Sequence, residues 1–245
     1  MHPPLFGLET EYGLSIHPQE PGRGARRADG VTLFMNAATQ ALPALPSLEG
    51  AGLFLENGAR FYLDAGCHPE MTTPECLNPW DVVRYVKAGD RNLLRVREAL
   101  LASDAGFQEV LLFRTNVDAA GSGSTWGCHA SFLHRNDPME MPPHIVPHLV
   151  SRLIYSGAGG VEWSGRQPRF TLSPRVRFLN HVISASSTGD RGIFHAKDES
   201  LGNGAYHRLH IICGESVCSE LSLWLTTGAT ALVVALAEMV TDRNQ

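Results

Sequence analysis

The sequence lacks the features that mark several specialised classes of protein. Its five cysteines include no CxxC pair, so we expect neither a disulfide framework nor a structural zinc site. Basic residues are scattered and the formal net charge is −5, which argues against a nucleic-acid partner. The first residues contain no basic region followed by an apolar stretch. We therefore predict no signal peptide and a cytoplasmic location.

Long uncharged runs are also scarce. One extends from Leu221 to Ala237 and lies between Glu220 and Glu238. Its 17 residues include threonines and a glycine, which makes it marginal for crossing a bilayer. We predict a buried core helix here and no association with a membrane.

The composition is that of a globular protein. The 245 residues are 43% hydrophobic and 18% charged, enough for one large domain or two small ones. Asn78 and Pro79 are typical of a helix start, and apolar residues then recur at helical spacing. Helices are expected over residues 31–42, 79–102, 142–155 and 219–239, a loop over 15–30, and strands over 109–115, 128–133, 169–172, 181–185 and 206–216.

The most informative stretch is NGARFYLDAGCHPEMTTPEC, residues 57–76. A strand here places Arg60, Tyr62 and Asp64 on one face, while the residues between them are apolar. A turn follows and brings in a further carboxylate, Glu70. This pattern can assemble an oxygen-rich site. The alternative is a surface ion pair that contributes little to stability.

A second acidic stretch, GLETEYG, occupies residues 7–13. In a strand, Glu9 and Glu11 share one face, where two carboxylates repel each other unless a cation lies between them. Oxygen ligands of this kind suit Mg²⁺. The alternative is a solvated edge strand, because edge strands often carry charge.

Two later stretches can add to the same site. His129 follows a Gly- and Ser-rich loop, and Arg208 shares a strand face with His210. A guanidinium next to carboxylates favours phosphate binding. A lone histidine is more often structural, however, and Arg208 can equally form an ion pair with Glu9 or Glu70.

The two motifs GLETEYG and NGARFYLDAGCHPE closely resemble those of the ligases and deamidases that act on the prokaryotic ubiquitin-like protein Pup. The resemblance extends through residues 127–133 and 208–220. It implies an α+β, glutamine synthetase-like fold with a curved, mainly antiparallel sheet and helices packed on one face. Residues 1–245 then form the N-terminal part of a single catalytic domain. Typical family members are longer, so we expect the chain to be truncated at its C-terminus.

The resemblance also implies roles for individual residues. Asp64 is the expected proton acceptor. The expected ATP contacts are Arg60 and Thr73, with Arg208 added from its strand face, and the expected magnesium ligands are Glu9, Tyr62 and Glu70, with Glu11 and His129 as further candidates. The geometry alone does not assign Tyr62 to a metal, because a buried tyrosine more often only forms a hydrogen bond.

The chain departs from the family at one position of this set. Relatives usually read His-Glu-Asn where this chain has His129, Ala130 and Ser131. The acid is missing, which questions any metal contact or structural role of a carboxylate at position 130.

The activity implied is an ATP- and Mg-dependent carboxylate–amine ligase. It would form an isopeptide bond between a glutamate of a Pup-like modifier and a lysine of a protein substrate through an acyl phosphate. The ligase branch is favoured by the wording FYLDAGCHPE and by the short interval between the two motifs. The alternatives are a Pup deamidase or depupylase, a truncated non-catalytic relative that binds nucleotide or a partner, and a ligase for free glutamate. The oligomeric state is left open.

Overall fold

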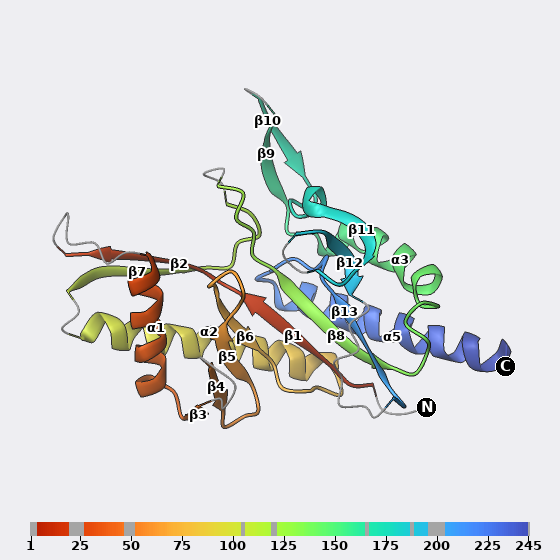
Figure 1. Ribbon diagram of the computed structural model, residues 1–245, viewed down its shortest axis with the longest axis horizontal. Coiled ribbons are helices and arrows are strands. Elements are labelled where there is room, and N and C mark those ends of the chain that lie inside the picture. The colour runs from red at the N-terminus through yellow and green to blue at the C-terminus, as the bar shows by residue number, and fades with distance from the viewer. Residues whose placement is uncertain are drawn as a thin grey trace.

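A nine-stranded sheet forms the centre of the protein in the computed structural model (Figure 1). The structure describes residues 4–19, 27–46, 52–103, 106–118, 122–164, 167–186, 189–195 and 204–244. The strand order is β11-β12-β13-β8-β1-β6-β5-β4-β3. The bounds are β1 (Phe6–Glu11), β3 (Ala44–Pro46), β4 (Gly52–Leu55), β5 (Arg60–Leu63), β6 (Pro69–Thr72), β8 (Cys128–His134), β11 (Leu179–Ser184), β12 (Arg191–His195) and β13 (His207–Ile211). Apart from the parallel pair β11–β12, the paired strands of this sheet are antiparallel.

Two further pairs of strands extend from the sheet. The strands β2 (Gly13–Pro18) and β7 (Phe107–Phe113) form one antiparallel ribbon, and β9 (Gly160–Ser164) and β10 (Gln167–Thr171) form another. Figure 1 shows the β9–β10 hairpin projecting away from the main body of the protein.

The helices pack on one face of the sheet. Their bounds are α1 (Arg27–Ala41), α2 (Pro79–Ala102), α3 (Pro142–Ser151), α4 (Leu153–Ser156) and α5 (Glu220–Asn244). Helix α2 contacts β1 and β6, α5 contacts β8, α1 packs on α2, and α3 packs on α5. Apolar side chains from these helices and from the sheet form two buried clusters between the layers. The expected α+β fold, with a mainly antiparallel sheet and helices on one face, is confirmed.

Helix α2 begins as its sequence indicates. The Asn78 side chain accepts a hydrogen bond from the backbone N–H of Asp81 at 3.0 Å, which satisfies one of the free donors of the first turn. Gly89 lies over β6, where an added Cβ would stand 2.8 Å from Cγ of Met71. This glycine therefore permits a close approach between the helix and the sheet.

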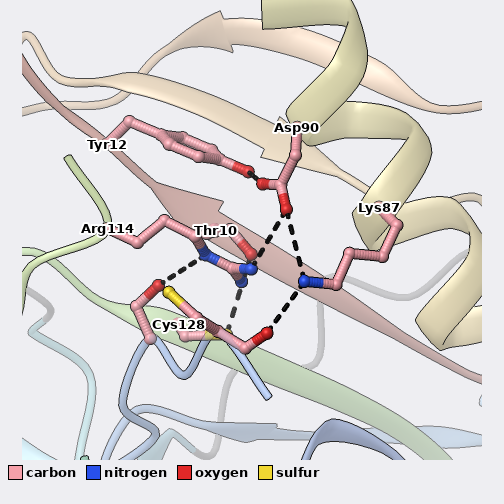
Figure 2. A network of polar contacts seen from close by, with 8 residues as sticks. Thr10, Tyr12, Lys87, Asp90, Arg114 and Cys128 are labelled. Atoms are coloured by element: carbon pink, nitrogen blue, oxygen red, sulfur yellow. Dashed lines mark hydrogen bonds and ion pairs between the residues drawn. The ribbon is translucent and has the colours of Figure 1, made fainter. Parts of the chain in front are cut away.

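A partly buried polar network also ties Tyr12, directly after β1, to α2 (Figure 2). The Tyr12 hydroxyl donates to Asp90 Oδ1 at 2.7 Å, and Arg114 Nη1 lies 3.4 Å from Asp90 Oδ2. Arg114 Nε donates to the Ser216 hydroxyl at 3.1 Å. The network therefore joins four segments that are distant in the sequence on the helix side of the sheet.

The expectation of a loop over residues 15–30 is wrong in part. Strand β2 continues to Pro18, and α1 begins at Arg27, four residues before the expected start. The remainder of that segment, residues 20–26, lies outside the described residues. Pro18 is accommodated because it closes the strand at a shift in register.

Three further elements are shaped by their surroundings. In strand β7 only Phe107 and Val110 are buried, because its partner is the outlying β2. Pro147 lies inside α3. Arg191 begins the strand β12. The acidic residues Asp198 and Glu199 lie outside the described residues.

Helix α5 was expected to be buried in the core, and this is wrong for one of its sides. Leu223, Val234 and Ala237 are buried, whereas Leu221 and Leu232 are 70% and 74% exposed. The helix is long and apolar enough to cross a bilayer by length and composition, and 28% of its most apolar stretch is buried inside the protein. Its apolar residues thus serve both the core and an exposed surface.

Candidate active site

A polar cavity of about 400 Å³ gathers residues from six strands of the sheet and from the turns between them. It contains eight of the nine side chains singled out from the sequence: Glu9, Glu11, Arg60, Tyr62, Asp64, Glu70, His129 and Arg208. The helices pack on the apolar residues that alternate with these. The cavity therefore lies on the face of the sheet away from the helices.

Strand register brings the acidic residues together. Glu11 is paired with Glu70 across β1 and β6, Tyr62 with Glu70 across β5 and β6, and Glu9 with His129 across β1 and β8. Between the two glutamates of β1, Thr10 is buried toward the helices. The expected division of faces along this strand is confirmed.

Crowding of carboxylates changes their ionisation. Burial and the charges of Glu9 and Glu11 raise the pKa of Glu70 from 4.5 to about 9. Burial also opposes ionisation of Glu9, but the hydrogen bond from His129 and the charges of neighbouring cations outweigh it and lower the pKa to about 2. One carboxyl group of the set, that of Glu70, thus holds a proton at neutral pH, because two ionised carboxylates stand beside it.

The donors fit a hard divalent cation. Ligand atoms of Glu11, Glu70 and His129 lie within 4.8 Å of one another, and the same is true of Glu9, His129 and His210. Carboxylate oxygens predominate among these donors, as suits Mg²⁺. The raised pKa of Glu70 is the structural sign that a cation would relieve repulsion here. Burial and the neighbouring Glu70 and Glu9 raise the pKa of Tyr62 as well, so its phenol is neutral.

Asp64 stands in the turn between β5 and β6. The backbone N–H of His68 donates to Asp64 Oδ1 at 2.6 Å, and Nδ1 of the same residue lies 3.3 Å from Asp64 Oδ2. Burial opposes ionisation of Asp64, but these contacts with His68 prevail and lower its pKa. Asp64 is therefore ionised in the cavity at neutral pH.

Three arginines line the cavity on or beside the strands β12 and β13. Arg208 lies on β13, Arg191 lies on β12, and Arg175 lies beside β13 with its side chain near the backbone of Ile212. Arg175 is only 4% exposed, and its Nε has no hydrogen-bond partner among the described residues. Burial lowers its pKa. The carboxylates of Glu11 and Glu215 attract this guanidinium but only partly offset its burial, so an anion in the adjoining space would stabilise it further.

Sequence reasoning missed Arg175, Arg191 and His195 as cavity residues. Arg191 and His195 lie at the two ends of β12, while Phe194 is buried in the core. The alternation along residues 191–195 could have revealed this strand. Arg175 follows Pro174 outside any strand, and no periodic signal marks it.

Thr73 is the one expected residue that does not line the cavity. It lines a neighbouring hollow of about 270 Å³ that also includes Glu9 and Arg208. Its hydroxyl accepts a hydrogen bond from the backbone N–H of Leu8 at 3.1 Å. Thr73 thus lies beside the carboxylates but in a separate space.

Ala130, which stands where relatives usually have an acid, lies on the side of the sheet away from the cavity. Its side chain is buried in the apolar cluster with Leu8 and Ile211, on the helix side of β8. The neighbouring His129 and Ser131 belong to the opposite face, and the Ser131 hydroxyl lies 3.0 Å from His210 Nδ1. The missing acid therefore removes no side chain from the cavity.

Comparison with known proteins gives a consistent result. A family model described as Pup-ligase protein matches residues 4–245. The chain is 35% identical over 242 residues to a Pup–protein ligase of Acidimicrobium ferrooxidans, and 34% identical over 240 residues to a Pup–protein ligase of Kineococcus radiotolerans. Each match covers 96% of this chain and 51% of the relative.

Solved structures resemble the chain over similar lengths. A crystal structure of the complex between the prokaryotic ubiquitin-like protein Pup and its ligase PafA matches with a TM-score of 0.75 and 30% identity, over 96% of this chain and 46% of that one. The Pup ligase PafA in complex with ADP matches with a TM-score of 0.63 and 28% identity, over 91% of this chain and 49% of that one. The chain spans about half the length of the relatives it matches.

Proposed function

The chain belongs to the Pup-ligase protein family, and we propose that it carries the catalytic sheet of an ATP- and magnesium-dependent ligase. The reaction joins a glutamate side chain of a Pup-like modifier to a lysine of a protein substrate. The observation that carries this proposal is one cavity that brings four carboxylates, Asp64 among them, together with four arginines. The similar proteins named as bound to Pup and to ADP support the same substrates.

Activation of a carboxylate requires that a phosphoryl group pass between two negatively charged reactants. When bound, ATP supplies that group, and Mg²⁺ lowers the repulsion between its phosphates and the acid. The residues that would hold magnesium are Glu9, Tyr62 and Glu70, together with Glu11 and His129. The residues that would contact ATP are Arg60, Thr73 and Arg208.

The arginines near β12 and β13 bind the phosphoryl group while it is transferred. Arg175 and Arg191 line the cavity with guanidinium groups whose geometry matches phosphate oxygens. Their positive charge stabilises the negative charge that spreads over the phosphoryl oxygens, which favours an acyl phosphate on the modifier. Because Arg175 is already buried and desolvated, little reorganisation is needed.

Asp64 acts on the incoming lysine. A lysine ammonium must lose a proton before its nitrogen can attack the acyl phosphate. The ionised carboxylate of Asp64 attracts the ammonium and accepts that proton as the C–N bond forms and phosphate departs. The lowered pKa of Asp64 ensures that its acceptor oxygens are free of a proton.

The continuity of the sheet supports a single catalytic domain over residues 1–245. Strands from both halves of the chain alternate in its order, and β1 near the N-terminus lies between β6 and β8. We place the activity in the cytoplasm, where ATP is available and free thiols such as Cys76 and Cys128 stay reduced.

The test is ATP-dependent conjugation of a purified Pup-like modifier to a lysine-bearing protein. Asp64→Asn should lower the rate about 100-fold or more, because it removes the proton acceptor while keeping a similar shape. Glu98→Gln, at an exposed position on α2, should leave the rate unchanged. Conjugation by Asp64→Asn at the parental rate would contradict the assignment. A parent that only converts a glutamine of the modifier to glutamate would instead be a deamidase.

A further inference from the structure

We propose that His68 is a positioning residue that fixes the orientation of the Asp64 carboxylate for proton transfer from the incoming amine. The inference rests on the proposed function and assigns His68 to its second half, the attack of the amine. His68 does not need to touch a substrate in this role, because it acts through the carboxylate that it holds.

The turn between β5 and β6 gives His68 two contacts with Asp64. The backbone N–H of His68 donates to Oδ1 at 2.6 Å, and the ring Nδ1 lies 3.3 Å from Oδ2. The backbone N–H of Asp64 donates to the carbonyl of His68 at 3.0 Å. Both carboxylate oxygens and the main chain are thus held by one residue, which restricts rotation of the Asp64 side chain.

The ring of His68 is itself held by further contacts. The same Nδ1 also lies 3.3 Å from Oε2 of Glu11, and the ring centroid lies 5.2 Å from that of Trp126. His68 is 9% exposed. A side chain fixed by packing and by a second carboxylate can transmit its position to Asp64, which a mobile surface residue cannot do.

The backbone of the turn is shaped for this arrangement. Cys67 adopts a left-handed conformation with φ of 59°, which is uncommon for a residue other than glycine. At Gly66, an added Cβ would stand 2.9 Å from Cε1 of His68 and 3.1 Å from Oδ2 of Asp64. The turn therefore has room for the contact between His68 and Asp64 only while position 66 lacks a side chain.

The two halves of the reaction can be measured apart. Hydroxylamine is uncharged at neutral pH and traps an acyl phosphate as a hydroxamate without giving up an ammonium proton. Transfer to lysine requires Asp64 as proton acceptor, whereas hydroxamate formation reports only that the acyl phosphate has formed. A residue that positions Asp64 should affect transfer to lysine and spare hydroxamate formation.

The experiment compares His68→Leu, His68→Asn and Gly66→Ala with the parent in both assays. His68→Leu should lower kcat for transfer to lysine about 100-fold and hydroxamate formation less than about 3-fold. His68→Asn keeps a donor close to the position of Nδ1, so it should recover at least about 10-fold of the lost transfer. Gly66→Ala should reproduce the loss without altering His68 itself.

His148→Leu is the matched control, because this histidine is also packed and its Nε2 lies 3.0 Å from the Thr230 hydroxyl, on the helix side of the protein. It should lower thermal stability without separating the two assays. The proposal is overturned if His68→Leu loses both activities in parallel, if it loses neither, or if His68→Asn transfers no better than His68→Leu. A parent that forms no hydroxamate contradicts the proposed function itself, and the role of His68 with it.

Discussion

Carboxylates crowd the cavity near β1, β6 and β5, whereas arginines crowd it near β12 and β13. At the β1–β6–β5 end, Glu70 is crowded by Glu9 and Glu11, and burial together with their charges raises its pKa to about 9. At the β12–β13 end, Arg175 is buried with Arg191 nearby, and burial lowers its pKa. Burying charges of one sign close together costs free energy at each end, so the first favours a bound cation and the second a bound anion. A nucleotide with its magnesium would relieve both ends together.

The largest expected effect comes from removing one carboxylate from the group near β1, β6 and β5. Glu70→Gln removes one of the proposed magnesium ligands, so conjugation should fall about 100-fold or more and the affinity for ATP with magnesium should fall with it. Calorimetric titration with ATP and magnesium measures the affinity, and the conjugation assay measures the rate. Parental binding and rate in this variant would mean that the acidic end does not hold the metal.

The next effect comes from the arginines near β12 and β13. Arg175→Met removes a buried guanidinium that donates to the carbonyl of Ile212 and is attracted by Glu11 and Glu215, so the free energy of unfolding should fall by about 1 kcal/mol or more. Conjugation should fall about 10-fold or more, because a contact to the phosphoryl oxygens is lost. Denaturant unfolding and the conjugation assay measure the two quantities. A gain in stability would show that these partners do not compensate the buried charge, and an unchanged conjugation rate would exclude a contact with the phosphoryl group.

A third effect is the pH dependence of the metal-free protein. The pKa of Glu70 is raised in the folded state, so its stabilising contribution is complete below pH 4.5 and is lost as the pH rises toward about 9. The parent should therefore lose stability relative to Glu70→Gln over this range. Unfolding free energies of both proteins in a chelator, measured at several pH values, test this difference. A constant difference would exclude a protonated Glu70.

The smallest effect is expected next to the acidic end. Thr73→Val removes the hydroxyl that accepts from the backbone N–H of Leu8 while keeping the side-chain shape. We expect a loss of about 1 kcal/mol in unfolding free energy and a rise of a few-fold in KM for ATP. Melting curves and steady-state kinetics measure the two. An unchanged KM would limit the nucleotide site to the main cavity.

The acidic end was largely accessible from the sequence. Alternation along residues 7–13 and 57–64 decides which side chains share a face, and both motifs lie on strands of the same sheet. The basic end was less accessible. Strand β12 has only 5 residues, too few for a clear alternation, and Arg175 reaches the cavity from an irregular segment. Its position depends on tertiary packing, which no local pattern encodes.

The elements of the fold also differ in whether local sequence or long-range packing determines them. Helix α2 is specified by its cap and its apolar spacing, both of which are local. The exposed side of α5 was missed because an uncharged run looks the same whether one or both of its sides are covered. Likewise, β7 has the composition of a buried strand, and only its pairing with β2 shows that it lies outside the main sheet.

The pairing of Glu11 with Glu70 and of Thr10 with Met71 has a consequence for how this region can change over time. Inserting or deleting a single residue in either strand would exchange the acidic and apolar faces of everything beyond it. Both the packing layer and the chemistry would be lost in one step. This segment can therefore drift by substitution, while changes of length are confined to the loops that flank it.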